Sequence, residues 1–296
     1  MLHIYQMNMT VNVYMDMGSI SQQQDVAVLK SIFKNVTVNS FHLCDVNVHL
    51  EIPRYSRLKY ATKNYIVPNP KTADPNWDLR PFTKVLCKSY YSFKVFNHLN
   101  SLFTSWTSQD IRQRTSKKFM FLHSTAGRHD RGTLEIVQLY KQARYNNIAL
   151  PPLIYVGKKI GTECQWVNNV FFYNGFISEV NFRNFQNSIM FHLCPYYYED
   201  FSHTMWEGLS TGAIVLTTNH SPMDIIGIKN LIDIDHKVKI NLVDGGVVSL
   251  LSLYAQIITA ANMSEQEALE RSEYNRGLWS ANNKSFINRI KTEFNA

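Results

Sequence analysis

The sequence contains few cysteines, and no spacing among its cysteines or histidines indicates a metal site. The four cysteines include no Cys-x-x-Cys pair, and the ten histidines include no His-x-His or His-x-x-x-His pair. Each cysteine lies in or beside an apolar stretch, so we expect free buried thiols in a reducing compartment rather than disulfides or zinc ligands. They are Cys44, Cys87, Cys164 and Cys194.

The sequence also lacks a long hydrophobic run and a block of like charge. No apolar run approaches the ~18 residues that a transmembrane helix needs. Residues 1–17 alternate polar and apolar side chains, unlike the basic and then apolar segments of a signal peptide. We therefore expect a cytoplasmic protein without a membrane span. The net charge is +7 with the basic residues scattered, so a small anion rather than nucleic acid is the expected partner.

The length of 296 residues and a hydrophobic fraction of 45% predict two domains with substantial cores. The first half opens with a strand, a turn containing Gly18, a helix and a second strand, at residues 10–16, about 22–33 and 36–43. The next strands are predicted at 65–70 and 83–87, and a helix follows the second of them through Phe96. Residues 102–106 close this half, and the polar stretch 109–118 is interpreted as a linker.

The second half restarts the alternation of strands and helices. Strands are predicted at 118–123, 152–156, 170–173, 189–193, 213–217 and 231–234, and helices at 133–145 and 265–294. Two successive runs of this kind imply an α/β protein with two parallel-sheet domains and a cleft between them.

The most informative segment is residues 191–224. A strand ends at Pro195, a polar loop follows, and a helix begins near Ser202, where unpaired N–H groups favour an anion. Two carboxylates separated by seven residues, Glu199 and Glu207, lie on the loop and the helix, where one can meet a sugar and the other ribose hydroxyls. The alternative is that Ser202 only caps the helix and that Glu199 is a solvated loop acid.

A second loop, after the strand at 118–123, contains glycine and arginine. Gly127 lets the backbone approach a diphosphate, and Arg128 and Arg131 can offset the charge of that group. A solvated basic loop is the alternative.

These two segments resemble the nucleotide-sugar signature of GT-B glycosyltransferases. The family's signature has two acids separated by seven residues, followed by a turn of small residues, and residues 191–224 match it. Residues 121–133 match the family's glycine–basic–basic loop. The resemblance implies the GT-B fold, with two Rossmann-like domains facing each other across a cleft. It implies an acceptor-binding domain at 1–112, a nucleotide-sugar-binding domain at 113–275 and a C-terminal helix at 276–296 that packs back toward the first domain. The implied donor-binding residues are Gly127, Arg128, Arg131, Glu199, Ser202, His203, Thr204 and Glu207.

The skeleton Leu-Cys-Pro, Trp-Glu and Gly-Ala-Ile-Val at 193–215 resembles the exostosin-like branch, including xylosyltransferases of large algal DNA viruses. That resemblance implies inverting transfer of xylose from UDP-xylose, with a β linkage, to a glycan hydroxyl such as that of fucose in a viral capsid N-glycan. It implies no cofactor and no obligatory metal, and a location in the host cytoplasm if the protein is viral. The alternatives are a retaining GT-B hexosyltransferase and a non-catalytic carbohydrate-binding protein on the same fold.

An inverting enzyme needs a base on the acceptor side. In GT-B enzymes that is the first domain. The candidates for the base are Asp74 and Asp78, on the loop after the strand at 65–70, and Asp16, at the end of the first strand. We choose Asp74, for which capping a turn beside Pro75 is the alternative role. The remaining candidates for acceptor binding are Asp16, Gly18, Trp77 and Asp78.

Two other classes are less well supported. Asp233-Ile-Asp235 has the form of the metal–diphosphate motif of GT-A transferases, the other large transferase fold. It lies in the second half of the chain, however, and the surrounding elements do not follow the GT-A order. A dinucleotide-binding enzyme would need G-x-G-x-x-G after the first strand, and the turn Asp16-Met-Gly18-Ser19 lacks it.

Overall fold

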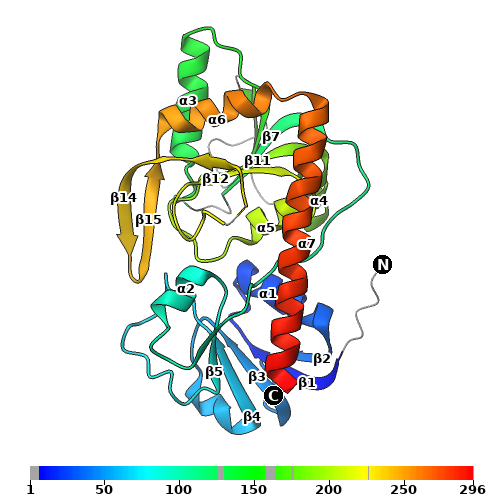
Figure 1. Cartoon of the computed structure of the whole chain (residues 1–296), viewed down its shortest axis with the longest axis vertical. Helices are drawn as coiled ribbons and strands as arrows, with labels where there is room; N and C mark the ends of the chain where they lie inside the picture. The colour runs from blue at the N-terminus through cyan, green and yellow to red at the C-terminus, as the bar shows by residue number, and fades with distance from the viewer. Residues whose placement is uncertain are drawn as a thin grey trace. The chain divides into compact units, whose positions relative to one another are not determined.

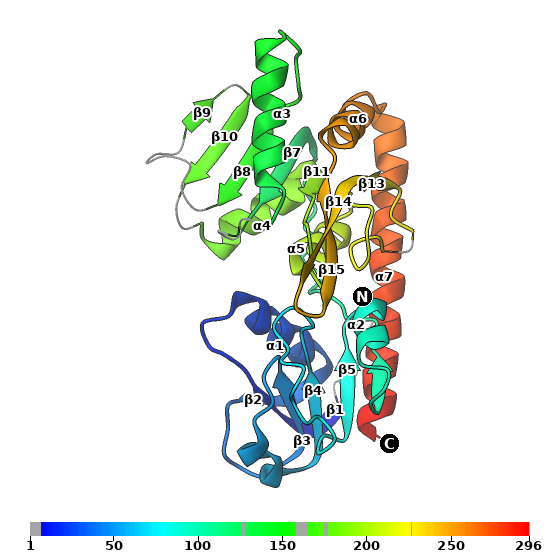
Figure 2. The same cartoon turned by 90° about the vertical axis from the view of Figure 1, so that its left-hand side faces the viewer.

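The computed structural model describes residues 7–125, 128, 130–157, 165–167, 169–174, 177–225 and 227–295. The chain divides into two compact units (Figures 1 and 2). Unit 1 contains Met1–Gln109, Ile240–Val243 and Ala281–Ala296, and unit 2 contains Asp110–Lys239 and Asp244–Ser280.

Unit 1 is built on a sheet of six parallel strands in the order β2-β1-β3-β4-β5-β6. The strands are β1 (Met7–Tyr14), β2 (Phe33–Val38), β3 (Cys44–Leu50), β4 (Ala61–Val67), β5 (Lys84–Cys87) and β6 (Ser101–Phe103). The helical segments are α1 (Ile20–Ile32), the 3₁₀ helix η1 (Tyr55–Tyr60) and α2 (Tyr90–Val95). Ser19 and Ser89 cap α1 and α2, because their side chains accept backbone N–H bonds of the first turn.

The sequence interpretation missed the central strand β3, and it placed the second strand too far along the chain, since β2 ends at Val38. In β3 polar residues alternate with valines, a pattern that also fits an exposed segment. Yet Asn47 and His49 are 0% exposed. Asn47 pairs in register with Asn12 of β1 and Asn64 of β4, and its amide donates to Asn64 Oδ1 at 2.9 Å. One face of the sheet therefore carries a buried row of amides.

The end of α7 (Glu265–Asn295) supplies apolar side chains to unit 1. Phe286, Ile290 and Phe294 are each 0% exposed. The ring of Phe294 stacks on Tyr65 and on Phe33, with centroid distances of 4.6 and 5.3 Å. Residues far apart in the sequence thus complete the core of this unit.

Unit 2 contains a seven-stranded sheet in the order β13-β12-β11-β7-β8-β10-β9, in which only β9 is antiparallel to its neighbour among the described pairings. The strands are β7 (Lys118–Ser124), β8 (Leu153–Gly157), β9 (Gln165–Val167), β10 (Val170–Asn174), β11 (Ile189–Cys194), β12 (Ile214–Thr218) and β13 (Asn230–Ile232). The helices are α3 (Thr133–Tyr145), α4 (Glu179–Ser188), α5 (His203–Ser210), α6 (Leu250–Ala261) and the first part of α7.

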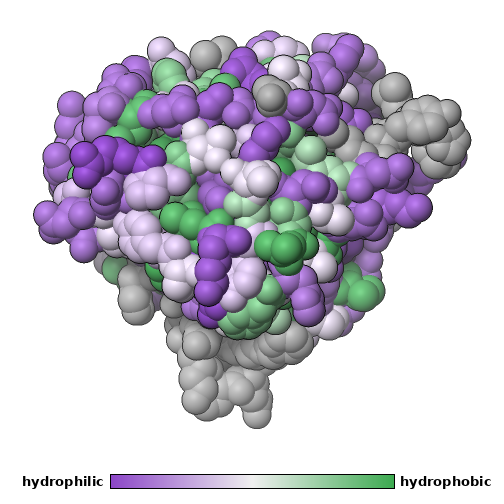
Figure 3. Space-filling view, turned by 90° about the horizontal axis from the view of Figure 1, so that it is seen from below, coloured by the Kyte–Doolittle hydropathy of each residue, from purple (hydrophilic) through white to green (hydrophobic). Residues whose placement is uncertain are grey.

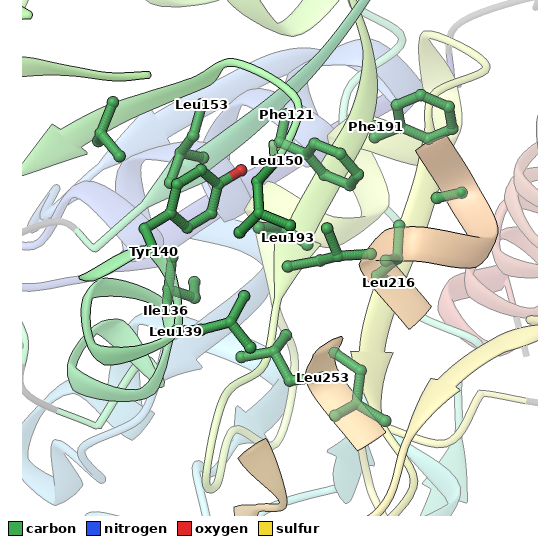
Figure 4. Close-up of a cluster of buried hydrophobic side chains, with 14 of the residues drawn as sticks. Phe121, Ile136, Leu139, Tyr140, Leu150, Leu153, Phe191, Leu193, Leu216 and Leu253 are labelled. Carbon is green, nitrogen blue, oxygen red and sulfur yellow. The ribbon is translucent and has the colours of Figure 1, made fainter. Parts of the chain in front are cut away.

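The core of unit 2 lies between this sheet and the helices α3 and α6. Phe121, Leu193 and Leu216 project from neighbouring strands β7, β11 and β12 (Figure 4). They belong to one buried cluster with Leu139 of α3 and Leu253 of α6. Burial of this apolar face fixes the strands whose carboxyl ends carry the candidate site.

A hairpin of β14 (Ile234–Ile240) and β15 (Val243–Val248) follows β13. The sequence interpretation had one strand at 231–234, and the structure divides this stretch between β13 and β14.

On the face drawn in Figure 3, hydrophobic residues occur in small groups among hydrophilic ones, as is usual for a surface in water.

The two parallel-sheet α/β units confirm the predicted fold class. Cys87 and Cys194 are free and buried, as expected, whereas Cys44 is free but half-buried, and Cys164 lies outside the described residues. Within the described part of the chain, no helix is long and apolar enough to cross a bilayer.

Candidate functional site

The candidate site of unit 2 lies at the point where the strand order reverses. From β7 the chain passes through α3 to β8 on one side, whereas from β11 it passes through α5 to β12 on the other. The loops that follow β7 and β11 therefore leave the carboxyl edge of the sheet side by side, where open α/β sheets bind ligands. A hydrogen bond joins them, since the Tyr197 N–H donates to the carbonyl oxygen of Asp130 at 3.0 Å.

Two arginines from the first loop meet a carboxylate from the second. Arg128 Nη1 lies 3.1 Å and Arg131 Nη2 lies 2.7 Å from Glu199 Oε2. Arg128 also forms a fork with Asp130, in which Nε and Nη2 donate to the two carboxylate oxygens at 3.0 and 2.5 Å. The structure therefore brings together three of the predicted donor-binding residues, Arg128, Arg131 and Glu199.

Arg131 is the more enclosed of the two arginines, with a side chain 12% exposed against 34% for Arg128. Its guanidinium carbon lies 4.1 Å from the ring centroid of Tyr196. Burial lowers the pKa of Arg131, but the nearby Glu199 carboxylate and other groups outweigh it, so the net pKa is raised. Nε and Nη1 of Arg131 have no hydrogen-bond partner among the described residues. This side chain stays charged, and both of these nitrogens are buried.

Gly132 connects the arginine loop to α3. It is the N-cap residue and has φ 68°. Because glycine has no side chain, no side-chain hydrogen bond caps the first turn of this helix. The side chain of Thr133, the first residue of the helix, is hydrogen-bonded to the ring of His123, with 3.0 Å between the Thr133 hydroxyl and His123 Nε2. The other ring nitrogen, Nδ1, donates to the carbonyl oxygen of Leu193. Burial lowers the pKa of His123 to about 4, so the ring is neutral and its Nε2 accepts a hydrogen bond from the Thr133 hydroxyl.

Ser202, His203 and Thr204 begin α5, as the sequence predicts for a helix start. Ser202 is the N-cap, and its hydroxyl accepts the N–H of Met205 at 3.3 Å. His203 is buried and packs edge-on against Phe201, whereas Thr204 is half-buried. The capping role considered for Ser202 is therefore present in the structure.

Glu207 lies within α5 and faces a neighbouring helix. It is 5% exposed, and its Oε2 accepts a hydrogen bond from Gln186 of α4 at 2.9 Å. Gly127, the remaining predicted donor-binding residue, lies outside the described residues.

In unit 1, the reversal of strand order falls between β1 and β3, and the turn after β1 contains Asp16 and Gly18. Asp16 is exposed, and its Oδ1 accepts the Gly18 N–H at 3.0 Å. The Gly18 amide is thus engaged within its own turn.

The loop after β4 carries the other candidates of unit 1. Asp74 is exposed, and its Oδ1 accepts the N–H of Asn76 at 2.9 Å, which is the turn-capping role named as its alternative. Asp78 forms a fork with Arg80, and hydrogen bonding to that arginine lowers the pKa of the Asp78 carboxyl. Trp77 is half-buried and packs against the core cluster of the unit.

Asp233 and Asp235 flank the start of β14 and are both exposed. Asp233 Oδ1 accepts a hydrogen bond from Asn219 at 2.8 Å. In the part of the chain that the structure describes, no group of three or more His, Cys, Asp or Glu side chains is arranged to hold a metal ion.

The sequence interpretation missed Asp130 and Tyr196, which contact the two arginines. Asp130 lies between Arg128 and Arg131 in the sequence, and an acid two residues from an arginine is a signal of a local ion pair. Nothing in the sequence marks Tyr196, because only the folded loop places its ring beneath Arg131.

This architecture is the fold of the GT-B glycosyltransferases. The chain is similar to the crystal structure of TarM, with a TM-score of 0.58 and 9% identity over 85% of this chain and 55% of that one. It is similar to the UDP-forming α,α-trehalose-phosphate synthase of Burkholderia vietnamiensis, with a TM-score of 0.58 and 6% identity over 85% and 74%.

A third similar structure is the pneumococcal O-GlcNAc transferase GtfA in complex with UDP and GlcNAc, with a TM-score of 0.57 and 9% identity over 84% of this chain. The chain spans 55% of the TarM chain and 56% of the GtfA chain. No protein-family model matches the sequence, and no curated protein matches it. At these identities the likeness establishes the fold.

Proposed function

We propose that the protein is a glycosyltransferase that binds the nucleoside diphosphate of a sugar donor at the switch point of unit 2. The observation that carries this proposal is the convergence of Arg128, Arg131 and Glu199 from two loops at that edge. A uridine diphosphate sugar is the best candidate, since similar structures include a transferase in complex with UDP and a UDP-forming synthase.

In the proposed reaction, an acceptor hydroxyl oxygen attacks the anomeric carbon of the donor sugar. The bond from that carbon to the phosphate oxygen breaks, and the nucleoside diphosphate leaves with the bonding electrons. Arg128 and Arg131 offset the charge that develops on this leaving group, so no obligatory metal is part of the proposal. The N-terminal turn of α3, which has no side-chain cap, adds a favourable dipole.

The finer assignment is inverting transfer of xylose from UDP-xylose to a glycan hydroxyl, such as fucose in a viral capsid N-glycan. It rests on the resemblance of the Leu-Cys-Pro, Trp-Glu and Gly-Ala-Ile-Val skeleton at 193–215 to exostosin-like enzymes. An inverting reaction passes the acceptor proton to a base, for which Asp74 is our candidate, with Asp16, Gly18, Trp77 and Asp78 contacting the acceptor. A retaining reaction would need no such base.

Arg131→Ala is expected to weaken UDP binding at least tenfold, because it removes a positive charge that lies at the switch point beside Glu199. Arg131→Lys should retain part of the affinity. The matched control is Arg276→Ala, since Arg276 also pairs with an acid, Asp110, and lies over an aromatic ring, Trp279. Calorimetric titration with UDP measures the affinity, and release of UDP from a panel of UDP-sugars measures turnover of the donor.

Unchanged UDP affinity in Arg131→Ala would refute the donor site. A non-catalytic carbohydrate-binding protein is the second candidate, because Asp74 already caps a turn and Asp78 is already paired with Arg80. Tight UDP-sugar binding with no release of UDP in the presence of glycan acceptors would favour it.

A further inference from the structure

We propose that Asp130 is an affinity-determining residue that competes with the ligand's phosphate for Arg128. This inference rests on the proposed function, because it concerns how the same site takes its ligand. The Asp130 carboxylate accepts two hydrogen bonds from the Arg128 guanidinium, and a phosphate group of the donor must replace it to form the same pair of bonds.

The geometry of the fork is the first argument. Nε and Nη2 of Arg128 donate to Oδ1 and Oδ2 of Asp130 at 3.0 and 2.5 Å, and Nη1 donates to Glu199 at 3.1 Å. Each guanidinium nitrogen therefore already faces a carboxylate oxygen. Carboxylate and phosphate present two oxygens to arginine in the same way, so they compete for one fork.

The charges at the site are the second argument. Two arginines face two carboxylates, Asp130 and Glu199, which makes this cluster neutral overall. A diphosphate brings about two or more negative charges, and a neutral cluster attracts it weakly. Releasing Arg128 from Asp130 would restore one positive charge toward the ligand.

The two acids are not equivalent. Glu199 Oε2 contacts both arginines, at 2.7 and 3.1 Å, and so holds the two loops together. Asp130 lies 3.9 Å from Arg131 and contacts Arg128 within a single loop. Opening the Asp130 fork therefore leaves the pair of Arg131 and Glu199 in place, whereas displacing Glu199 would disrupt both arginines.

The test compares Asp130→Asn with the wild-type protein. Asparagine keeps the shape of the side chain and removes its charge, so we expect the affinity for UDP and for pyrophosphate to rise by about tenfold. A purely supporting role for Asp130 gives the opposite result, since Arg128 would then lose its orientation and bind UDP more weakly. The direction of the change separates the two roles.

The matched control is Asp110→Asn, which breaks another two-point carboxylate–arginine pair of unit 2. Arg276 donates to the oxygens of Asp110 at 2.8 and 2.6 Å, and the change in net charge is the same. It should leave the affinity for UDP within twofold of the wild type. Thermal unfolding checks that Asp130→Asn folds, and Asp130→Ala serves as a second variant.

Calorimetric titrations with UDP and pyrophosphate have three outcomes. Tighter binding in Asp130→Asn, but not in Asp110→Asn, supports the inference. UDP binding that is equal or weaker in Asp130→Asn overturns it and leaves the proposed function standing. Absence of UDP binding in both the wild type and Asp130→Asn overturns the inference and the proposed function together.

Discussion

Gly132 has a left-handed backbone and a close neighbour on the second loop of the site. A Cβ built at this position would lie 2.3 Å from the carbonyl oxygen of Pro195, and φ is 68°. Any other residue would strain the backbone and push apart the two loops that carry the arginines and Glu199. The glycine is thus required by the site as well as by the helix.

Gly132→Ala is expected to lower the free energy of unfolding of unit 2 by about 2–4 kcal/mol, from left-handed strain and the clash with Pro195. It should also weaken UDP binding. Gly277→Ala is the control, because a Cβ there meets nothing within 4 Å and lies within a helix, where alanine is favoured by about 1 kcal/mol. Urea unfolding measures both, and equal stability of Gly132→Ala and wild type would contradict the argument.

At the scale of single residues, part of the candidate site could be predicted from sequence. Arg128, Arg131 and Glu199 were named from the chemistry of their two loops and from the resemblance to the GT-B signature, and they meet in the structure. Asp130 was overlooked, although its place two residues from Arg128 is a sequence signal of a local ion pair.

Among the elements, β3 was missed in the sequence because its alternating polar residues fit an exposed segment, although they are buried in the structure. Asn12, Asn47 and Asn64 lie opposite one another on β1, β3 and β4, and each is buried. Asn47 donates to the Asn64 side chain and to the carbonyl of Arg57 at 3.1 Å. A polar residue every second position normally indicates a solvated face, whereas here each amide is paired with another polar group.

Asn47→Ala should lower the free energy of unfolding of unit 1 by about 2–4 kcal/mol, because it removes the hydrogen bonds to Oδ1 of the buried Asn64 and to the carbonyl of the half-buried Arg57. Asn8→Ala, at an exposed position of the neighbouring strand β1, should change it by less than about 0.5 kcal/mol. Denaturant titration followed by circular dichroism provides the comparison. A small effect at Asn47 would mean that the amide row contributes little to stability.

At the scale of the whole molecule, three buried histidines link stability to pH. Burial lowers the pKa of His49 in unit 1 and of His123 in unit 2 to about 4, and that of His192 in unit 2 to about 3. An unfolded histidine has a pKa of about 6.5. Between these values the unfolded chain binds protons that the folded chain does not, so stability is complete above pH 6.5 and falls as the pH is lowered toward 4.

His192→Leu should reduce this loss. Each such histidine accounts for about 2 kcal/mol of destabilisation between pH 7 and pH 5, so the variant should lose about 2 kcal/mol less than wild type over that range. The carboxylates titrate equally in both proteins and cancel in the difference. His236→Gln, on the exposed hairpin, is the control and should follow the wild-type curve in urea unfolding. Parallel curves for His192→Leu and wild type would refute the role of His192.

The sequence by itself determined the class of fold, because strand and helix periodicities follow from local side-chain patterns that survive without knowledge of partners. It also identified helix α3 at Thr133–Tyr145 and the two loops that carry Arg128, Arg131 and Glu199. The tertiary structure decided the rest: that β3 is central, that Glu199 contacts both arginines, and that Tyr196 lies under Arg131. These features depend on contacts between residues distant in sequence or on which polar groups are buried, and neither follows from local pattern.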